Sequence, residues 1–303
     1  MSKEILVTGG TGLIGTYLKK YLPTATYVGS KDFNLLDLTE VKKMFSEVKP
    51  KKVIHLAAIV GGVHHNIEEP VKYFEENILM NTFILKESFA NDVENFLGIL
   101  SSCIYPDDIN KYPIKESELL NGAPHKDLFS YSYAKRCMAI HIDMYNKKFK
   151  TKYNYIIPCN LYGEFDKFDA IKGHFVGALI EKIIEAKIKK KNKITLFGDG
   201  TPYRQFMHAK DVAKIISIMI SKKKFFNMNI ATNENYSIDH IAKIALEACD
   251  ATNISIEYDN TKPNGQMRKD IEILNMVKYF PDFTAIKLKD GIRDIYNKRM
   301  KLK

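Results

Sequence analysis

The sequence predicts an α/β fold: a Rossmann-type doubly wound parallel sheet with a smaller C-terminal α/β lobe. Short apolar runs alternate with longer segments of helical periodicity, as in proteins whose parallel strands are joined by helices. A glycine-rich turn separates the first apolar run from the first helix, and beyond residue 162 the alternation stops. We therefore expect a first domain over 1–162 with a returning segment near 205–230, and a second lobe over 163–204 and 231–303.

Length and composition indicate a globular chain. Its 303 residues are 45% hydrophobic and 27% charged, with a formal net charge of +10. Much of the positive charge is lysine in runs such as 187–193 and 222–224, without the interleaved aromatic residues typical of single-strand nucleic-acid binding. Apolar windows fall short of the roughly 18 residues of a membrane span. Met1 to Glu4 lead directly into an apolar run, so we expect no signal peptide and a cytoplasmic protein.

The four cysteines are far apart and form no C-x-x-C pair: they are Cys103, Cys137, Cys159 and Cys249. This spacing predicts neither a disulfide framework nor a metal site.

The first predicted strand, residues 5–8, is followed by glycines spaced G-x-x-G-x-x-G and then by a helical pattern. Between a strand and a helix, such glycines let the backbone turn tightly and approach a pyrophosphate at the helix N-terminus. The turn therefore predicts dinucleotide binding by Gly9, Gly12, Leu13, Ile14 and Gly15.

The second predicted strand, residues 26–28, bears on the choice of dinucleotide. An acidic residue at its end would favour NAD, through the ribose hydroxyls. Here the strand leads into Ser30 and Lys31, which could bind a 2′-phosphate, so we expect NADP(H). Asp32 leaves NAD open as an alternative.

Further cofactor contacts are expected after the second and third strands. A helix is predicted to open within residues 34–38, and a third strand over 53–58 ends in small residues that let a cofactor lie against it. A helix over 70–91 follows, with proline in its first turn. The residues we expect to contact the cofactor here are Asp37, at the adenine edge, Leu38, Leu56, Ala57 and Ala58.

The fourth predicted strand, residues 96–100, ends at Ser101, and the next helix begins with Tyr131-x-x-x-Lys135. Four residues place both side chains on one helix face. A phenol titrates near about 10, and we expect the Lys135 ammonium to lower that pKa toward neutrality. Ser101 could then donate to a substrate carbonyl while Tyr131 protonates it. The Y-x-x-x-K pattern is common in ordinary helices, so its weight depends on this context.

The rest of the chain predicts a strand over 153–158, a helix over 174–188, a strand over 194–197 and a helix over 212–221. The last of these would return to the first domain.

Together these motifs resemble the extended short-chain dehydrogenase/reductase superfamily, and within it the GDP-L-fucose synthase family. That family carries out 3,5-epimerisation and 4-reduction of GDP-4-keto-6-deoxy-D-mannose. The resemblance spans nearly the whole chain. Besides the glycine turn, Ser101, Tyr131 and Lys135, it is carried by the segments 101–106, 116–122, 160–163, 200–206 and 261–269, and by His174.

The resemblance implies roles for individual residues. Tyr131 would protonate the C4 oxygen, Lys135 would assist it and bind the cofactor ribose, and Ser101 would orient the carbonyl. Cys103 would be the base of the epimerisation and His174 the acid on the other face of the sugar. The nucleotide sugar would be bound by Asn160, Lys182, Arg204 and Lys269.

The thiol and imidazole suit that chemistry. A C4 ketone acidifies the protons at C3 and C5, and inversion needs one group to remove a proton and another to return one. Free thiols and imidazoles titrate near about 8.5 and 6.5. From the residues alone, however, Cys103 is typical of a buried core thiol and His174 of a surface residue at a helix start.

Three positions depart from the family pattern as we align it: Glu164 replaces proline, residues 166–168 read Asp-Lys-Phe instead of Asp-Asn-Phe, and Gly177 replaces proline. These changes crowd the loop that would cover the sugar. They leave open an enzyme that only reduces C4, acting on a GDP-4-keto-deoxyheptose.

The sequence thus predicts an NADP(H)-dependent reductase of a GDP-4-keto-6-deoxy sugar, with prior C3/C5 epimerisation, in GDP-deoxysugar synthesis. Its first domain would bind NADP(H) and its second lobe the nucleotide sugar. An NAD-dependent nucleotide-sugar 4-epimerase or 4,6-dehydratase, and a non-catalytic NADP-binding module, also fit the motifs. By analogy with related enzymes, which pair through a bundle containing the Tyr-x-x-x-Lys helix, we expect a homodimer. We expect no metal, no nucleic acid and no membrane partner.

Overall fold

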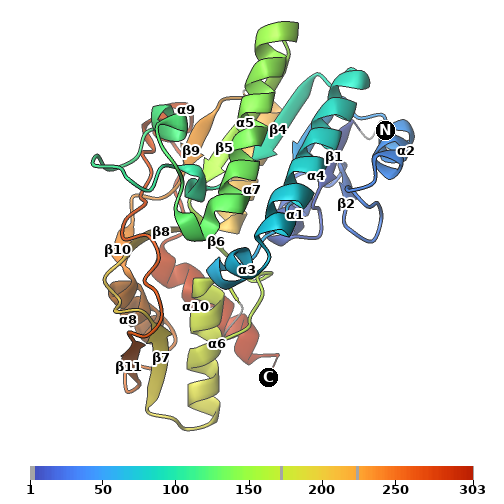
Figure 1. The fold of residues 1–303 in the computed structure, drawn as a ribbon. Helices are drawn as coiled ribbons and strands as arrows, with labels where there is room; N and C mark the ends of the chain where they lie inside the picture. Colours follow the sequence, from blue (N-terminus) through green and yellow to red (C-terminus); the bar gives the residue numbers. More distant parts are fainter. Residues whose placement is uncertain (1–3, 171–172, 223–224, 303) are drawn as a thin grey trace.

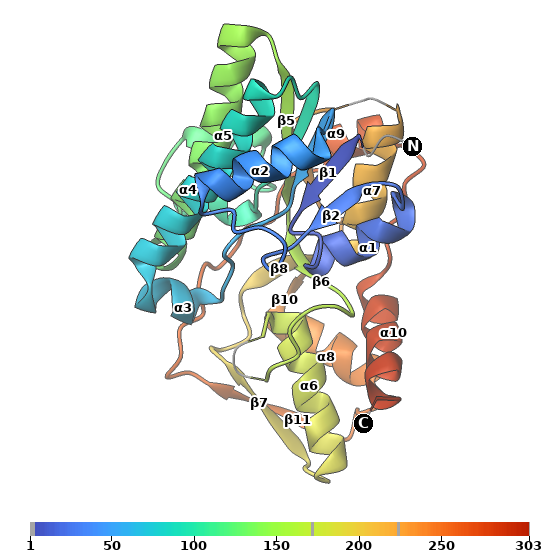
Figure 2. The same ribbon diagram turned by 90° about the vertical axis from the view of Figure 1, so that its right-hand side faces the viewer.

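A six-stranded parallel sheet forms the centre of the computed structural model, which describes residues 4–170, 173–222 and 225–302 (Figures 1 and 2). The strand order is β2-β1-β3-β4-β5-β9. The strands are β1 (Ile5–Thr8), β2 (Thr26–Val28), β3 (Lys52–His55), β4 (Asn95–Ile99), β5 (Lys152–Pro158) and β9 (Met228–Ile230). The order reverses direction between β1 and β3, where open α/β sheets bind ligands. The predicted doubly wound fold is confirmed.

Helices cover both faces of this sheet (Figure 2). One face carries α1 (Leu13–Tyr21) and α7 (Ala209–Lys222), which pack against each other. The other carries α2 (Leu38–Val48), α4 (Pro70–Ala90) and α5 (Phe129–Phe149), and the short α3 (Val63–Glu68) lies beside α4 and α5. The predicted helix 212–221 is the central part of α7.

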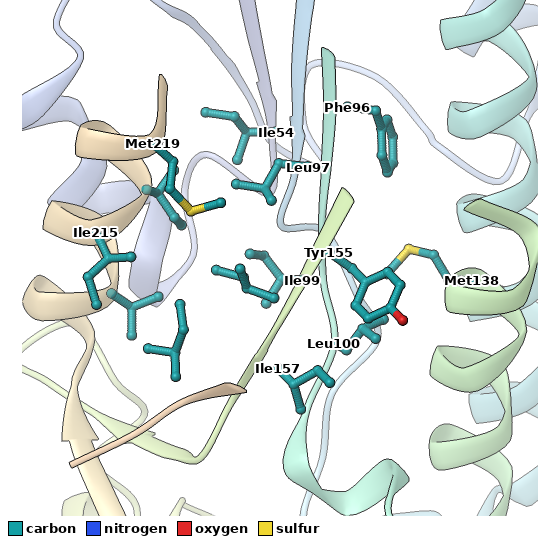
Figure 3. Close-up of a cluster of buried hydrophobic side chains, with 14 of the residues drawn as sticks. Ile54, Phe96, Leu97, Ile99, Leu100, Met138, Tyr155, Ile157, Ile215 and Met219 are labelled. Atoms are coloured by element: carbon teal, nitrogen blue, oxygen red, sulfur yellow. The ribbon is translucent and has the colours of Figure 1, made fainter. Parts of the chain in front are cut away.

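The main hydrophobic core fills both sides of the sheet (Figure 3). Ile215 and Met219 of α7 approach the strands from one side, and Met138 of α5 from the other. Strand residues between them, such as Leu97, are fully buried. Because both faces are covered, the strands are continuous apolar runs, which is why they are readable in the sequence.

A second hydrophobic cluster lies below the sheet in Figure 1. It involves α6 (Phe175–Ile188), α8 (Ile238–Ala248), α10 (Leu288–Met300) and the paired strands β7 (Lys193–Phe197) and β11 (Ser255–Asp259). Between the two clusters runs a three-stranded sheet of β10 (Asn235–Ser237), β8 (Tyr203–His208) and β6 (Asn160–Tyr162). The helix α9 (Leu274–Tyr279) contacts β9, and Met276 joins the main core. The predicted domain boundaries remain a prediction.

Several element ends differ from the sequence prediction. β3 ends at His55, three residues earlier than predicted, so Leu56 to Ala58 lie beyond the strand. The neighbouring strand β1 ends at Thr8, which pairs with His55, and its chain turns at Gly9. Leu56 keeps one backbone bond to Thr8, at 3.1 Å. The helix expected within 34–38 begins at Leu38. Within the described ranges, no helix is long and apolar enough to span a bilayer.

Candidate active site

The glycine turn after β1 has the geometry expected of a dinucleotide cradle. Gly9 has a φ of +68°, and a Cβ there would lie 2.6 Å from the Ala57 backbone nitrogen. A Cβ on Gly15 would lie 2.6 Å from the Gly9 carbonyl oxygen. Only glycine allows this left-handed turn and the close packing of α1 on it. The turn leads into the N-terminus of α1 at Leu13, with Gly12 as the N-cap residue and Ile14 next in the helix, so a phosphate fits here.

The segment after β2 is arranged for a 2′-phosphate more readily than for a ribose diol. Ser30 and Lys31 are exposed, whereas the Asp32 carboxylate turns back and accepts a hydrogen bond from Gly29 N at 2.7 Å. One oxygen of that carboxylate therefore caps its own turn, and the exposed Ser30 and Lys31 are the residues here that suit a 2′-phosphate.

The other predicted cofactor residues lie around the same crevice. Asp37 is the N-cap of α2, and its Oδ1 accepts from Thr39 N at 2.7 Å. One of its carboxylate oxygens therefore stabilises the helix start, and contact with adenine stays a prediction. Leu38 follows it, and Leu56, Ala57 and Ala58 are half-buried beyond β3.

Tyr131 and Lys135 lie one turn apart on α5 and face each other. Lys135 Nζ is 5.9 Å from the centroid of the Tyr131 ring. It is 1% exposed and donates to the Ile99 carbonyl oxygen, at the end of β4, at 2.8 Å. Burial lowers the pKa of Lys135 to about 8, because desolvation disfavours the ammonium. Tyr133 turns away and lies against Phe129 and Arg136.

The expected lowering of the Tyr131 pKa is wrong for this structure. Burial raises the pKa of this phenol, and the nearby Cys103 adds to the increase. Desolvation of the phenolate is the dominant effect. The phenol is therefore protonated at neutral pH, which is the form a proton donor needs. Lys135 remains placed to stabilise the phenolate that forms after donation.

Ser101 and Cys103 follow β4, and Cys103 interacts electrostatically with Tyr131. Ser101 is the N-cap residue of the short helix η1 (Ser102–Ile104), which contains Cys103, 7% exposed. Arg136 of α5 fixes this turn: its Nε donates to the Ile104 carbonyl oxygen and its Nη1 to that of Gly122, the latter at 2.6 Å. Arg136 cannot be singled out from the sequence, because a buried arginine on a helix carries no pattern of its own.

Two half-buried cations from the C-terminal half of the chain lie near this site, and one of them, Lys269, interacts with Cys103. Lys269 interacts electrostatically with Arg204, Cys103 and Cys159, and burial with the neighbouring Arg204 lowers its pKa to about 8. Burial lowers the pKa of Arg204 to about 10. Two desolvated like charges favour an anion between or beside them. By contrast, Arg268 is paired with Asp270, through bonds of 2.5 and 3.0 Å.

Backbone pairing explains why Lys269 reaches this site. The Ile114 N–H donates to the Asp270 carbonyl oxygen at 2.8 Å, and the Glu272 N–H donates to the Ile114 carbonyl oxygen at the same distance. The 268–272 segment thus runs beside the chain that follows Cys103. This pairing between distant segments leaves no trace in local sequence.

Lys182 and Asn160, both predicted to bind substrate, lie on α6 and at the start of β6. Lys182 of α6 donates to the Thr195 carbonyl oxygen at 2.7 Å, and its Nζ lies 5.0 Å from the centroid of Phe197. Phe197, 51% exposed, was not singled out in the sequence; it offers a flat ring beside a cation. The Asn160 amide donates to the Gln205 carbonyl oxygen at 2.9 Å, between β6 and β8.

His174 is the N-cap residue of α6 and is exposed. Its Nδ1 lies 2.8 Å from Asp166 Oδ1, and that hydrogen bond raises the pKa of the imidazole. Among the described residues, no hydrogen bond, ion pair or ring contact joins His174 to Cys103 or Tyr131. The N-terminal ends of α5 and α6 both lie at the junction of the sheet and the lower region (Figures 1 and 2).

The residues of this site could perform two kinds of proton transfer. A phenol could donate a proton to a carbonyl oxygen beside a bound dinucleotide, and a thiol and an imidazole could move protons at a neighbouring carbon. Cys103, Tyr131 and Lys135 interact with one another, and Ser101 precedes Cys103 at the start of η1; we name these four residues the α5 cluster. Asp166 and His174 form a second, which we name the loop pair. Three or more His, Cys, Asp or Glu side chains placed to hold a metal ion do not occur in the described part of the chain.

Comparison with known proteins agrees with this geometry. Residues 5–231 match the model of the NAD dependent epimerase/dehydratase family. The GDP-L-fucose synthase of Dictyostelium discoideum is 32% identical over 96% of this chain and 93% of its own length. The GDP-L-colitose synthase of Yersinia pseudotuberculosis is 33% identical over 89% of both chains.

A solved structure gives the same result in three dimensions. The GDP-L-fucose synthetase of Naegleria fowleri bound to NADP superposes with a TM-score of 0.88 at 30% identity, covering 98% of this chain and 92% of its own. The chain therefore belongs to the NAD dependent epimerase/dehydratase family, within the group of extended short-chain dehydrogenases/reductases that includes the GDP-L-fucose synthases.

Proposed function

We propose that this chain is an NADP(H)-dependent enzyme that epimerises C3 and C5 of a GDP-linked 4-keto-6-deoxy sugar and then reduces C4. One observation carries this proposal: Lys135, buried and bonded to the Ile99 carbonyl oxygen at the end of β4, lies 5.9 Å from the Tyr131 ring, and Cys103 follows that strand in η1. The names of the similar synthases support the choice of sugar nucleotide.

NADP(H) fits the residues that would bind it. Gly9, Gly12 and Gly15 leave room for the pyrophosphate at the start of α1, and Ser30 and Lys31 are exposed where a 2′-phosphate would lie. When bound, NADPH supplies the hydride that adds to C4.

In the reduction, the Tyr131 hydroxyl gives its proton to the C4 oxygen as that carbon becomes tetrahedral. The ammonium of Lys135 stabilises the phenolate that remains, and Ser101 donates a hydrogen bond to the same oxygen. The sugar alcohol leaves, and a proton from solvent restores the phenol. Burial keeps the phenol protonated until the oxygen develops charge.

In the epimerisation, Cys103 takes a proton from a carbon next to the ketone, and the electron pair moves toward the C4 oxygen to form an enolate. His174 returns a proton to the opposite face, so the configuration inverts. Cys103 is then a neutral thiol and His174 a neutral imidazole, so the thiol must release its proton and His174 must regain one before the second carbon is inverted. His174, 46% exposed at its side chain, can exchange protons with solvent before the next inversion.

The diphosphate of the nucleotide would be bound by Arg204 and Lys269, two half-buried neighbouring cations whose mutual repulsion an anion would relieve. Lys182 and Asn160 would contact the remainder of the GDP-sugar. We infer that two chains pair through α4 and α5, which expose large apolar side chains at Val71, Phe74, Leu79, Phe89, Met144 and Phe149. Light scattering should give a dimer, and Phe74→Glu should yield monomers.

The test supplies purified protein with NADPH in D2O and either GDP-4-keto-6-deoxymannose or GDP-4-keto-6-deoxyheptose. We expect NADPH oxidation and a product carrying deuterium at C3 and C5. Failure to oxidise NADPH with either sugar would falsify the proposal. Oxidation without ring deuterium would indicate a C4 reductase only, and preference for the second sugar would identify the heptose.

A redox-neutral enzyme or a simple binding module would give different results in the same assay. A 4-epimerase or 4,6-dehydratase would purify with bound NAD and consume no net NADPH. A non-catalytic module would bind NADPH without turnover. The presence of Tyr131, Lys135 and Ser101 together speaks against a non-catalytic module.

A further inference from the structure

Asp166 is a carboxylate whose side chain is buried although it lies in a loop. It follows β6 in an irregular loop, yet its side chain is only 4% exposed. Its Oδ1 lies 2.8 Å from His174 Nδ1 and also accepts from Lys167 N at 2.8 Å. Its Oδ2 is buried and, among the described residues, has no hydrogen-bond partner. A buried carboxylate is costly unless a cation or donor compensates it, and the imidazole is the ionisable donor it contacts.

The contact fixes which nitrogen of His174 carries out chemistry. An ionised carboxylate only accepts hydrogen bonds, so His174 Nδ1 must carry the proton in this pair. Nε2 is then the nitrogen left to give a proton to a ligand. The same bond favours the charged imidazolium and raises the pKa of His174. An acid needs both properties.

Three other charged residues near the loop act differently from Asp166. Lys167 is the second charge that acts on His174, and it lowers the pKa of His174. Glu164 is paired with Lys298 of α10. Glu181 of α6 is paired with Arg299 at 3.0 Å. Asp166, by contrast, bonds His174 directly and raises its pKa through that hydrogen bond and its charge.

Gly177 of α6 packs closely on this loop. A Cβ built on Gly177 would lie 3.2 Å from the Lys167 carbonyl oxygen, a tight contact, and 3.7 Å from Asp166 Oδ2, an ordinary one. A side chain larger than alanine there would press on the loop backbone. The loop is also held at its start, where Asp166 N donates to the Gly163 carbonyl oxygen at 3.2 Å.

We propose that Asp166 is a positioning residue for the epimerisation, holding His174 by Nδ1–H so that Nε2–H returns the proton to the sugar. This inference rests on the proposed epimerase function. In the step, the Nε2–H bond breaks, its electron pair stays on nitrogen, and the enolate pair forms the new C–H bond. His174 becomes neutral while hydrogen-bonded to Asp166 and regains a proton from solvent.

The experiment compares wild type, Asp166→Asn, Asp166→Glu and the control Glu181→Gln, which removes a buried charge from the Glu181–Arg299 ion pair of the same region. Each is loaded with NADP⁺, so that no hydride is available, and given GDP-4-keto-6-deoxymannose in D2O. Deuterium entering C3 and C5 is followed by mass spectrometry across pH. Histidine-labelled protein gives the titration of His174 by NMR, and NADPH binding checks that each variant is folded.

We expect Asp166→Asn to slow deuterium entry about 10- to 100-fold, as for other groups that orient an imidazole. Its His174 titration and the falling limb of its pH profile should move to lower pH. Asp166→Glu should restore part of both, and Glu181→Gln should match wild type. NADPH binding should be unchanged in all four.

Two results would overturn the inference while the proposed function stands. Unchanged deuterium entry in Asp166→Asn would mean that the carboxylate is not needed. Slow entry with an unmoved His174 titration would mean that Asp166 only supports the loop. If wild type itself takes up no ring deuterium, the proposed epimerisation fails, and the role of Asp166 fails with it.

Discussion

The α5 cluster and the loop pair are built by different physical means. Tyr131 and Lys135 lie on a long helix against a buried strand, and Lys135 is 1% exposed. His174 stands at the end of an irregular loop and is 46% exposed at its side chain. In the α5 cluster, burial is the main cause of the pKa shifts: it raises the pKa of Tyr131 and lowers that of Lys135. In the loop pair, a hydrogen bond to the Asp166 carboxylate is the main cause, and it raises the pKa of His174.

This difference indicates a division of labour. A rigid, desolvated cluster suits hydride transfer, because water must be kept from the developing charge. A partly exposed acid suits repeated proton exchange. Cys103, the proposed base, interacts electrostatically with Tyr131 and Lys269, and no contact within the described residues joins it to His174. The proposed base and acid of the epimerisation therefore lie on separate elements, η1 and the start of α6.

We expect the largest effect from a substitution that disables the α5 cluster alone. Tyr131→Phe should reduce NADPH oxidation by about 10³-fold, within the range for loss of a general acid, because the C4 oxygen loses its proton source. NADPH binding and ring deuterium uptake should remain. Steady-state kinetics with NADPH fluorescence titration checks this. Tyr133→Phe is the matched control, and near-normal turnover of Tyr131→Phe would rule out its role as the donor.

Cys103→Ser tests whether the α5 cluster, which contains Cys103, also takes part in the epimerisation proposed for the loop pair. A hydroxyl is a far weaker base than a thiolate near neutral pH, so ring deuterium uptake should fall by about 10²-fold. Cofactor binding should not change. Mass spectrometry of the sugar measures the uptake, with Cys137→Ser, a half-buried thiol on the same α5 helix, as the control. Equal losses in both variants would show a packing effect instead.

The pH dependence of the two steps should separate them. The pKa of Lys135 is lowered to about 8, so its ammonium is lost as pH rises through that value, and hydride transfer should then fall about tenfold per unit. The pKa of His174 is raised above its ordinary value, so its acid form persists above about 6.5 and is lost at higher pH. Rates of NADPH oxidation and of deuterium uptake, measured from pH 6 to 10, test both. A flat oxidation profile through about pH 8 would contradict the Lys135 role.

The features with local sequence patterns are those that could be predicted, and they belong mainly to the sheet and the α5 cluster. The buried strands, Gly9 with its positive φ, and the one-turn spacing of Tyr131 and Lys135 all have local patterns, and the structure bears out the parallel sheet they predict. Local spacing did not give the sign of the Tyr131 pKa shift, since desolvation depends on the whole packing around it.

Contacts between distant segments had no sequence signal. Asp166 pairs with a residue eight positions later across a loop, and Lys269 reaches Cys103 through pairing of the segments around 114 and 271. In the sequence, residues 164–168 stand out only as departures from a family pattern. Their function in holding the loop became visible only with the ion pairs in place.

The smallest expected effect concerns how the loop pair is held. Glu164 Oε2 lies 2.5 Å from Lys298 Nζ of α10, and Glu164 N donates to Tyr17 Oη of α1 at 2.9 Å. Lys298 is 51% exposed, so the ion pair should stabilise the fold by less than about 1 kcal/mol. Lys298→Met should therefore slow deuterium uptake only about twofold, and high salt should remove most of that difference by screening the pair. A double-mutant cycle with Glu164→Gln isolates the pair itself. If Lys298→Met slows hydride transfer as much as deuterium uptake, the loop pair and the α5 cluster are not independent, and the contrast between them is lost.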